Sequence, residues 1–171
     1  SNRTVTLRPV TNQFGLATIT VTATDAGGAS RSRSFTLRVN PVNDAPTLAA
    51  INNLVINEDS GLQTVTLTGI TSGAANENQP LTVTATSSNP GLVPHPTLSY
   101  TSPSPTGSLS FTPVADQSGV ATITVTVNDG QGTNATVTRS FTVTVNPVND
   151  PPTLAAISNV MVDEDRGPLA V

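Results

Sequence analysis

The sequence predicts an all-β chain built from tandem antiparallel seven-stranded sandwiches, and three observations lead to this prediction. The segment NPVNDAPTLAAI at Asn40–Ile51 recurs as NPVNDPPTLAAI at Asn146–Ile157, a spacing that corresponds to one domain. Apolar and polar residues alternate with a period of two, as in strands that have one buried face. Thr and Ser are abundant while Glu and Leu are scarce, a composition that favours strands over helices.

The strands of one complete repeat follow from this alternation. In the segment 121–127, Ala121, Ile123, Val125 and Val127 face inward and threonines face outward. The same pattern predicts the other strands at 48–56, 62–67, 81–85, 97–100, 108–111 and 141–145. Seven short strands separated by Gly, Pro, Asn and Asp turns are typical of a two-sheet sandwich.

The chain also begins and ends within a repeat. Residues 1–42 correspond to the last part of one repeat, 43–149 form a complete repeat, and 150–171 correspond to the first part of another. In the first part, strands are expected around Val5–Leu7, over Ala17–Ala23 and over Phe35–Val39, the last two with an inward apolar face like that of the complete repeat. The two copies differ by two residues in a Gly-rich segment, which indicates a hairpin loop.

Composition excludes several functions. The net charge is −4 and all seven basic residues are Arg, so a nucleic acid or an anionic membrane would find no basic face to bind. The chain has no Cys and no apolar run long enough to insert into a membrane. The single His95 lies between two prolines with no nucleophile placed beside it, so we expect a solvated turn residue and no catalysis.

Two segments resemble a known family. ATITVTATDAGG…SFTLRVNPVNDAP and ATITVTVNDGQG…SFTVTVNPVNDPP are similar to the closing strands and linker of a cadherin-like repeat. The whole chain resembles the tandem bacterial Ig-like or cadherin-like repeats of large secreted surface proteins of the adhesin type, in which a V-N-D-A-P linker precedes N-E-D-S-G. The resemblance implies Greek-key sandwiches on the bacterial cell surface.

The resemblance also implies calcium at the junctions between repeats, because cadherin-like junctions hold Ca²⁺ with carboxylates from both sides. The expected ligands at the second junction are Glu58, Asp59, Asp116, Asn149 and Asp150, and those at the first are Asn43, Asp44 and Glu77. Ca²⁺ takes six to eight oxygens. The acidic set is thinner at the first junction, where Asn12 stands in the position of Asp116. The alternative is that these Asn and Asp residues cap turns without metal.

The expected function is therefore that of a non-catalytic spacer or stalk, whose partners are the neighbouring repeats. Prolines 41, 46, 147, 151 and 152 restrict bending of the linkers. The alternative is a subunit of an extracellular filament or sheath that packs laterally or end to end against other copies. Simple head-to-tail completion of the partial repeats would leave the middle strands unsupplied. A carbohydrate-binding module is less expected with only Tyr100 and four Phe, as is ice binding by the Thr rows.

Overall fold

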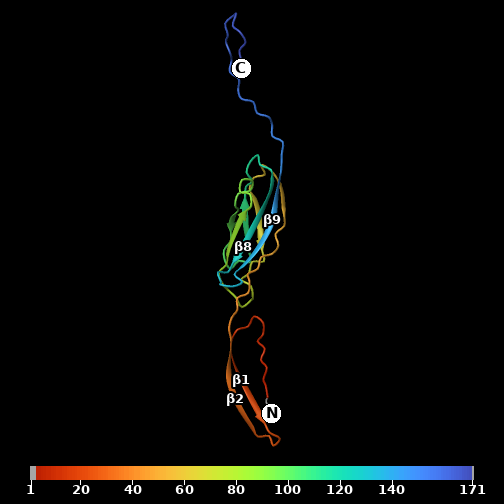
Figure 1. Cartoon of the computed structure of the whole chain (residues 1–171), viewed down its shortest axis with the longest axis vertical. Helices are drawn as coiled ribbons and strands as arrows, with labels where there is room; N and C mark the ends of the chain where they lie inside the picture. Colours follow the sequence, from red (N-terminus) through yellow and green to blue (C-terminus); the bar gives the residue numbers. More distant parts are fainter. Residues whose placement is uncertain (1–2, 171) are drawn as a thin grey trace.

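The computed structural model describes residues 3–170, and within them the chain is extended along one axis (Figure 1). The β1–β2 hairpin lies at one end, a β-sandwich follows, and the closing segment lies beyond it. The strands of the described residues are β1 (Gly15–Thr24), β2 (Ser30–Val39), β3 (Leu54–Asn57), β4 (Gln63–Thr68), β5 (Thr82–Ser87), β6 (Thr97–Ser99), β7 (Thr106–Phe111), β8 (Gly119–Asn128) and β9 (Thr136–Asn146). No helix of this part of the chain is long and apolar enough to cross a membrane. The all-β prediction is confirmed.

The sandwich consists of two sheets. One has the strand order β3-β9-β8-β5 and the other β4-β7-β6. Their neighbouring strands are antiparallel, as predicted, except that β3 pairs with β9 in parallel.

The parallel pair arises because the segment expected as one strand, 48–56, crosses between the sheets. At its start, Thr47 forms an isolated bridge with Thr71 on the side of the three-stranded sheet. The chain then joins the other sheet, where the Asn53 side chain accepts a hydrogen bond from the backbone N–H of Thr142 at 2.8 Å. Only 54–57 becomes a strand, so the predicted long strand is wrong in its first half.

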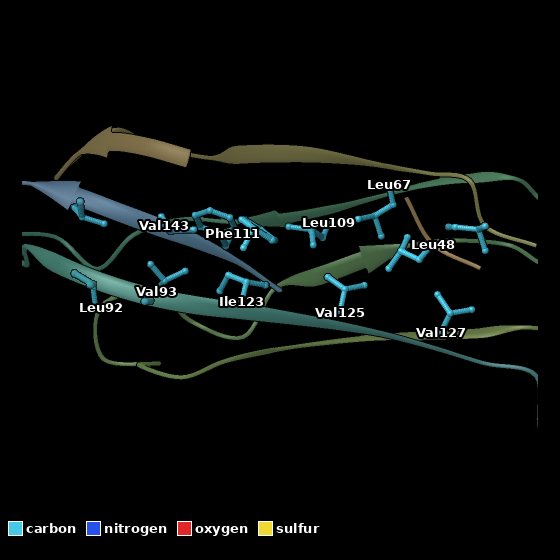
Figure 2. Close-up of a cluster of buried hydrophobic side chains, with 14 of the residues drawn as sticks. Leu48, Leu67, Leu92, Val93, Leu109, Phe111, Ile123, Val125, Val127 and Val143 are labelled. Carbon is cyan, nitrogen blue, oxygen red and sulfur yellow. The ribbon is translucent and has the colours of Figure 1, made fainter. Parts of the chain in front are cut away.

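The core lies between the two sheets, and the inward faces predicted from the alternation form it (Figure 2). Ile123, Val125 and Val127 of β8 are fully buried against residues of β4 and β7 such as Leu67 and Leu109. Residues between the strands complete the core, namely Leu48, Ile70, Leu81, Leu92 and Val93. Dense packing of this kind is the main source of stability in a small domain.

The same residue types are exposed in the β1–β2 hairpin. Phe35 is 46% exposed, whereas Phe141, its counterpart in the complete repeat, is 2% exposed. The hairpin is a two-stranded sheet on its own, so its apolar face has no opposing sheet among the described residues. The predicted strand at Val5–Leu7 is wrong, since residues 3–14 form none. Its counterpart β7 is held between β4 and β6, and neither has a copy in the part described before β1.

His95 has a structural role that the sequence did not indicate. Its Nδ1 accepts a hydrogen bond from the backbone N–H of Ser87 at 2.9 Å, which fixes the loop between β5 and β6 to the end of β5. We expect His95→Ala to lower the free energy of unfolding by about 1 kcal/mol, the usual net worth of one hydrogen bond. His95→Asn keeps an acceptor near the same place and should lose less, as urea denaturation of both variants can check. Equal losses would contradict this role.

Candidate functional site at the two poles of the complete repeat

Three acidic residues meet at the pole where the chain leaves the sandwich. Asp59 follows β3, Asp116 lies between β7 and β8, and Asp150 lies in the linker after β9. One carboxylate oxygen of each lies within 4.8 Å of the others. The backbone N–H of Asp116 also donates a long hydrogen bond of 3.4 Å to Oδ1 of Asp59. Of the five residues expected at the second junction, the structure thus brings three together in one cluster.

The two loop aspartates have an unusual backbone conformation. Asp59 and Asp116 have φ values of 61° and 56°, in the left-handed region that Asn and Asp adopt more readily than other residues with a side chain. The corresponding residues of the neighbouring repeats, Asp165 and Asn12, have the same φ values of 61° and 56°. Turn geometry therefore explains why Asn or Asp stands at these positions, and it also turns them toward the same pole.

Glu58 fastens the outgoing linker to this pole. Its side chain is 7% exposed, and its Oε1 accepts a hydrogen bond from the backbone N–H of Val148 at 2.6 Å. Its own backbone N–H donates to the carbonyl of Asn146 at 2.9 Å. Asn149, which is exposed, donates from Nδ2 to the carbonyl of Asp150. These hydrogen bonds use Oε1 of Glu58 and Nδ2 of Asn149. Glu58 is not among the three clustered carboxylates, and calcium ligation by Glu58 and Asn149 stays a prediction.

The electrostatics of the cluster are unfavourable for three unneutralised carboxylates. Partial desolvation raises the pKa of Asp150 above its ordinary value of 3.8, and the negative charges of Asp116, Asp59 and Glu58 raise this pKa further. The donor set fits a hard cation such as Ca²⁺, which accepts carboxylate oxygens and fills its remaining positions with carbonyls and water. A bound Ca²⁺ would supply the positive charge that these carboxylates lack.

The raised pKa of Asp150 leads to a testable pH dependence. A carboxyl group whose pKa is higher in the folded state stabilises that state below its unfolded pKa, and this contribution is lost as the pH rises through the folded pKa. We expect Asp116→Asn to lower the pKa of Asp150, because one of the neighbouring charges is removed. NMR titration of the carboxyl carbons in the presence of a chelator would measure the shift. Asp44→Asn is the matched control and should leave the pKa of Asp150 unchanged.

The linker that contains Asn43 and Asp44 enters the sandwich at the opposite pole (Figure 1), and Glu77 contacts the linker there. Glu77 is engaged by backbone groups, since its Oε1 accepts from the N–H of Asp44 at 2.8 Å and its Oε2 from that of Ala74 at 3.3 Å. Asn43 also bonds to loops of the sandwich. Asp44 and Asn12 line a cleft of about 260 Å³ together with Asn76. Among the described residues, Asn43, Asp44 and Glu77 form no acidic cluster like the one at the opposite pole.

Sequence reasoning missed the residues that receive Asn43. The Nδ2 of Asn43 donates to Oδ2 of Asp129 at 2.9 Å, and its Oδ1 accepts from Nε2 of Gln79 at 2.7 Å. Asp129 begins a Gly-containing hairpin turn, a position where Asp usually serves the turn alone, yet it is 2% exposed. Its counterpart in the first hairpin, Asp25, is exposed and bonds only to its own turn. No local pattern could have distinguished the two.

Comparison with known proteins identifies the family and adds distant structural similarities. The sequence profile described as bacterial Ig domain matches residues 43–146. Domains 4 and 5 of the S-layer protein SbsC are 19% identical with a TM-score of 0.41, covering 68% of this chain and 59% of that one. The titin M3 domain is 13% identical with a TM-score of 0.41, covering 59% of this chain and 96% of that one. An endo-fucoidan hydrolase of glycoside hydrolase family 107 is 22% identical with a TM-score of 0.44, covering 82% of this chain and 20% of that one.

Similarities of this size carry no functional information, and a search of curated protein sequences finds no significant match. The match to the family profile is informative, because it spans more than half of the chain and includes all seven strands of the sandwich. Its limits also coincide with structural features, since it starts at the linker residue Asn43 and ends at Asn146, the last residue of β9. The chain therefore belongs to the bacterial Ig domain family.

Proposed function

We propose that this chain is a non-catalytic spacer segment of an extracellular bacterial surface protein, in which calcium stiffens the junctions between consecutive Ig repeats. One observation carries the proposal. Asp150 of the outgoing linker lies within 4.8 Å of Asp59 and Asp116 of the sandwich, so an ion bound there would join the linker to the domain.

The linker is already restrained without an ion. Glu58 holds the N–H of Val148, and the flanking Pro147, Pro151 and Pro152 keep the chain extended because proline fixes φ and disfavours a helical conformation before it. Beyond Val148, repulsion of Asp150 by Asp116 and Asp59 favours a swing of the linker away from the pole. Calcium coordinated by Asp59, Asp116 and Asp150 would remove that repulsion.

The weak calcium affinity expected of these three carboxylates also suits an extracellular location. Three exposed carboxylates form a sparse set, and sparse, flexible sites bind calcium weakly, as extracellular modules with dissociation constants of about 10⁻⁴–10⁻³ M do. Such a site is filled outside the cell, where calcium is abundant. A chain without cysteine has no disulfide to stabilise it there, which leaves the core and bound ions.

Calcium titration of the whole chain by calorimetry tests the proposal. We expect Asp59→Asn, Asp116→Asn and Asp150→Asn each to weaken binding by on the order of tenfold or more, since the number of charged ligands sets affinity over decades. Asn tolerates the left-handed conformation of the two loops, so these variants should fold. Asp44→Asn changes the same linker position at the other junction and is the matched control.

Small-angle scattering with and without chelator tests the mechanical part of the proposal. Removal of calcium should broaden the distribution of end-to-end distances, and the effect should vanish in Asp150→Asn. Absence of calcium binding well above about 1 mM would contradict the calcium site. Scattering mass that grows with concentration would favour the filament subunit over the spacer.

A further inference from the structure

The Asn–Asp pair of the repeated linker has contacts at both poles of the sandwich, and the two poles use different members of the pair. Asn43 is bound by the repeat that follows its linker, whereas Asp150 lies against the repeat that precedes its linker. Asn43 and Asp44 correspond to Asn149 and Asp150 in the repeated NPVND segment. The first junction therefore shows the contact of the asparagine with the following repeat, and the second shows the position of the aspartate against the preceding repeat.

The site that receives Asn43 combines the buried carboxylate of Asp129 with polar groups of exposed or partly buried loop residues. Besides Asp129, the carbonyls of Thr133 and Asn134 accept from Nδ2 of Asn43 at 3.0 and 3.4 Å. The side chain of Asn134 in turn donates to the carbonyl of Asn43 at 3.1 Å. Gln79 closes the site from the opposite loop. Both ends of the amide and the backbone carbonyl of Asn43 thus have partners, which selects an asparagine.

A nearly fully buried carboxylate gives this site its strength. Oδ1 of Asp129 accepts from the backbone N–H of Gln131 at 2.9 Å, and Oδ2 accepts from Asn43. A buried charge without such donors is costly, so the loop that carries Asp129 depends on the linker amide for part of its stability. Linker and sandwich are coupled through a neutral amide and need no ion at this pole.

The first junction also has a feature that corresponds to the aspartate side of the pair. Asp44, the counterpart of Asp150, lines the 260 Å³ cleft together with Asn12, the counterpart of Asp116. Asp44 therefore borders a cleft that loop residues of the preceding and the following repeat both line, while Asn43 beside it is bound by the following one. The asparagine and the aspartate of the pair are thus neighbours along the linker.

We infer that the Asn–Asp pair is a two-sided connector: the aspartate lies at the pole of the preceding Ig repeat, and the asparagine binds the buried Asp129 and the partly buried Gln79 on the following one. Asn149 is then the group presented to a following Ig repeat that carries the counterparts of Asp129 and Gln79. The inference rests on the proposed spacer role. Its asparagine side does not depend on calcium, because it uses hydrogen bonds alone, whereas its aspartate side needs the ion that offsets the repulsion between Asp150, Asp59 and Asp116.

Spin labels can test the two sides separately, because the chain has no native cysteine. One pair of labels, Arg31→Cys with Thr84→Cys, reports on the first hairpin relative to the sandwich. A second pair, Thr84→Cys with Ser158→Cys, reports on the closing segment. Distance distributions are measured by pulsed electron resonance for the whole chain, in chelator and in calcium.

Asn43→Ala should broaden the first distribution in both chelator and calcium, leave the second unchanged, and lower the unfolding temperature of the sandwich by roughly 4–8 °C. Asn149→Ala is the matched control and should change neither the first distribution nor the unfolding temperature. Asp150→Asn should broaden only the second distribution, and only in calcium. If Asn43→Ala does not fold, Gln79→Met removes a single partner and should broaden the first distribution to a smaller extent.

The outcomes separate this inference from the proposed function. If Asn43→Ala and Asn149→Ala behave alike, the two-sided connector is wrong. If Asn43→Ala acts as expected but calcium has no effect on the second distribution, the asparagine side of the connector stands, and the aspartate side fails together with the calcium proposal.

Discussion

Replacing Phe141 with alanine should lower the free energy of unfolding by about 3–5 kcal/mol, the range measured when a large aromatic side chain is deleted from a packed core. Phe141 is 2% exposed and lies on β9 among the buried residues of both sheets. A loss of this size is a large fraction of the stability of a domain of this length, so the variant should be close to unfolding at room temperature.

The matched control for this change is Phe35→Ala. Phe35 occupies the same position in the repeat but is 46% exposed, and we expect a loss of about 1 kcal/mol or less. Urea denaturation followed through the single tyrosine, Tyr100, which packs against the core of the sandwich, compares the two. Similar losses would mean that the hairpin face is covered as well as the core.

Gly73→Ala should be the most damaging single-methyl change at the entry pole. Gly73 has φ +117°, and an added Cβ would lie 2.7 Å from the carbonyl oxygen of Asp44 and 3.0 Å from that of Ala45. The backbone strain and the clash together should cost about 2–5 kcal/mol. Because the obstructed groups are the linker backbone itself, the change should also displace the linker from the pole.

Gly119→Ala is the control that measures the cost of backbone strain at a positive φ without a steric clash of the added methyl group. Gly119 has a comparable φ of +141°, but an added Cβ there would meet only Cδ2 of Leu92 at 3.5 Å, an ordinary contact. We expect Gly73→Ala to be the more destabilising by about 1–3 kcal/mol, the typical cost of overpacking. Thermal unfolding of both variants measures the difference. Equal losses of stability would show that the linker backbone moves away from the added methyl group at no cost.

The strands of the sandwich could be predicted because each one carries its own signal. Strict alternation in 121–127 gives one buried and one hydroxyl-bearing face whatever the partner strand, and Ile123, Val125 and Val127 are indeed fully buried. The segment 48–56 could not be predicted in the same way. Ala49 near its start donates to the carbonyl of Thr68 in β4, whereas its end pairs with β9 of the other sheet, and only the position of both sheets determines where it crosses.

The gathering of Asp59, Asp116 and Asp150 was predictable in part. A seven-strand sandwich returns their loops to one pole, and the family resemblance indicated which loops matter. It also grouped Glu58 and Asn149 with the ligands, which stays a prediction; in the structure Oε1 of Glu58 and Nδ2 of Asn149 bond to the linker backbone. Whether a carboxylate faces an ion site or a backbone amide depends on side-chain direction, which a sequence position does not specify.

Local alternation and duplication were enough to predict the all-β class, the repeat length and the faces of the regular strands. The role of each copy of a residue could not be predicted in this way and follows from its surroundings in the fold. Phe35 and Phe141, or Asp25 and Asp129, are equivalent in sequence, yet one of each pair is exposed and the other buried. The physical reason is that burial and partner choice depend on the opposing sheet and on the linker that docks against it, and both lie far away along the chain.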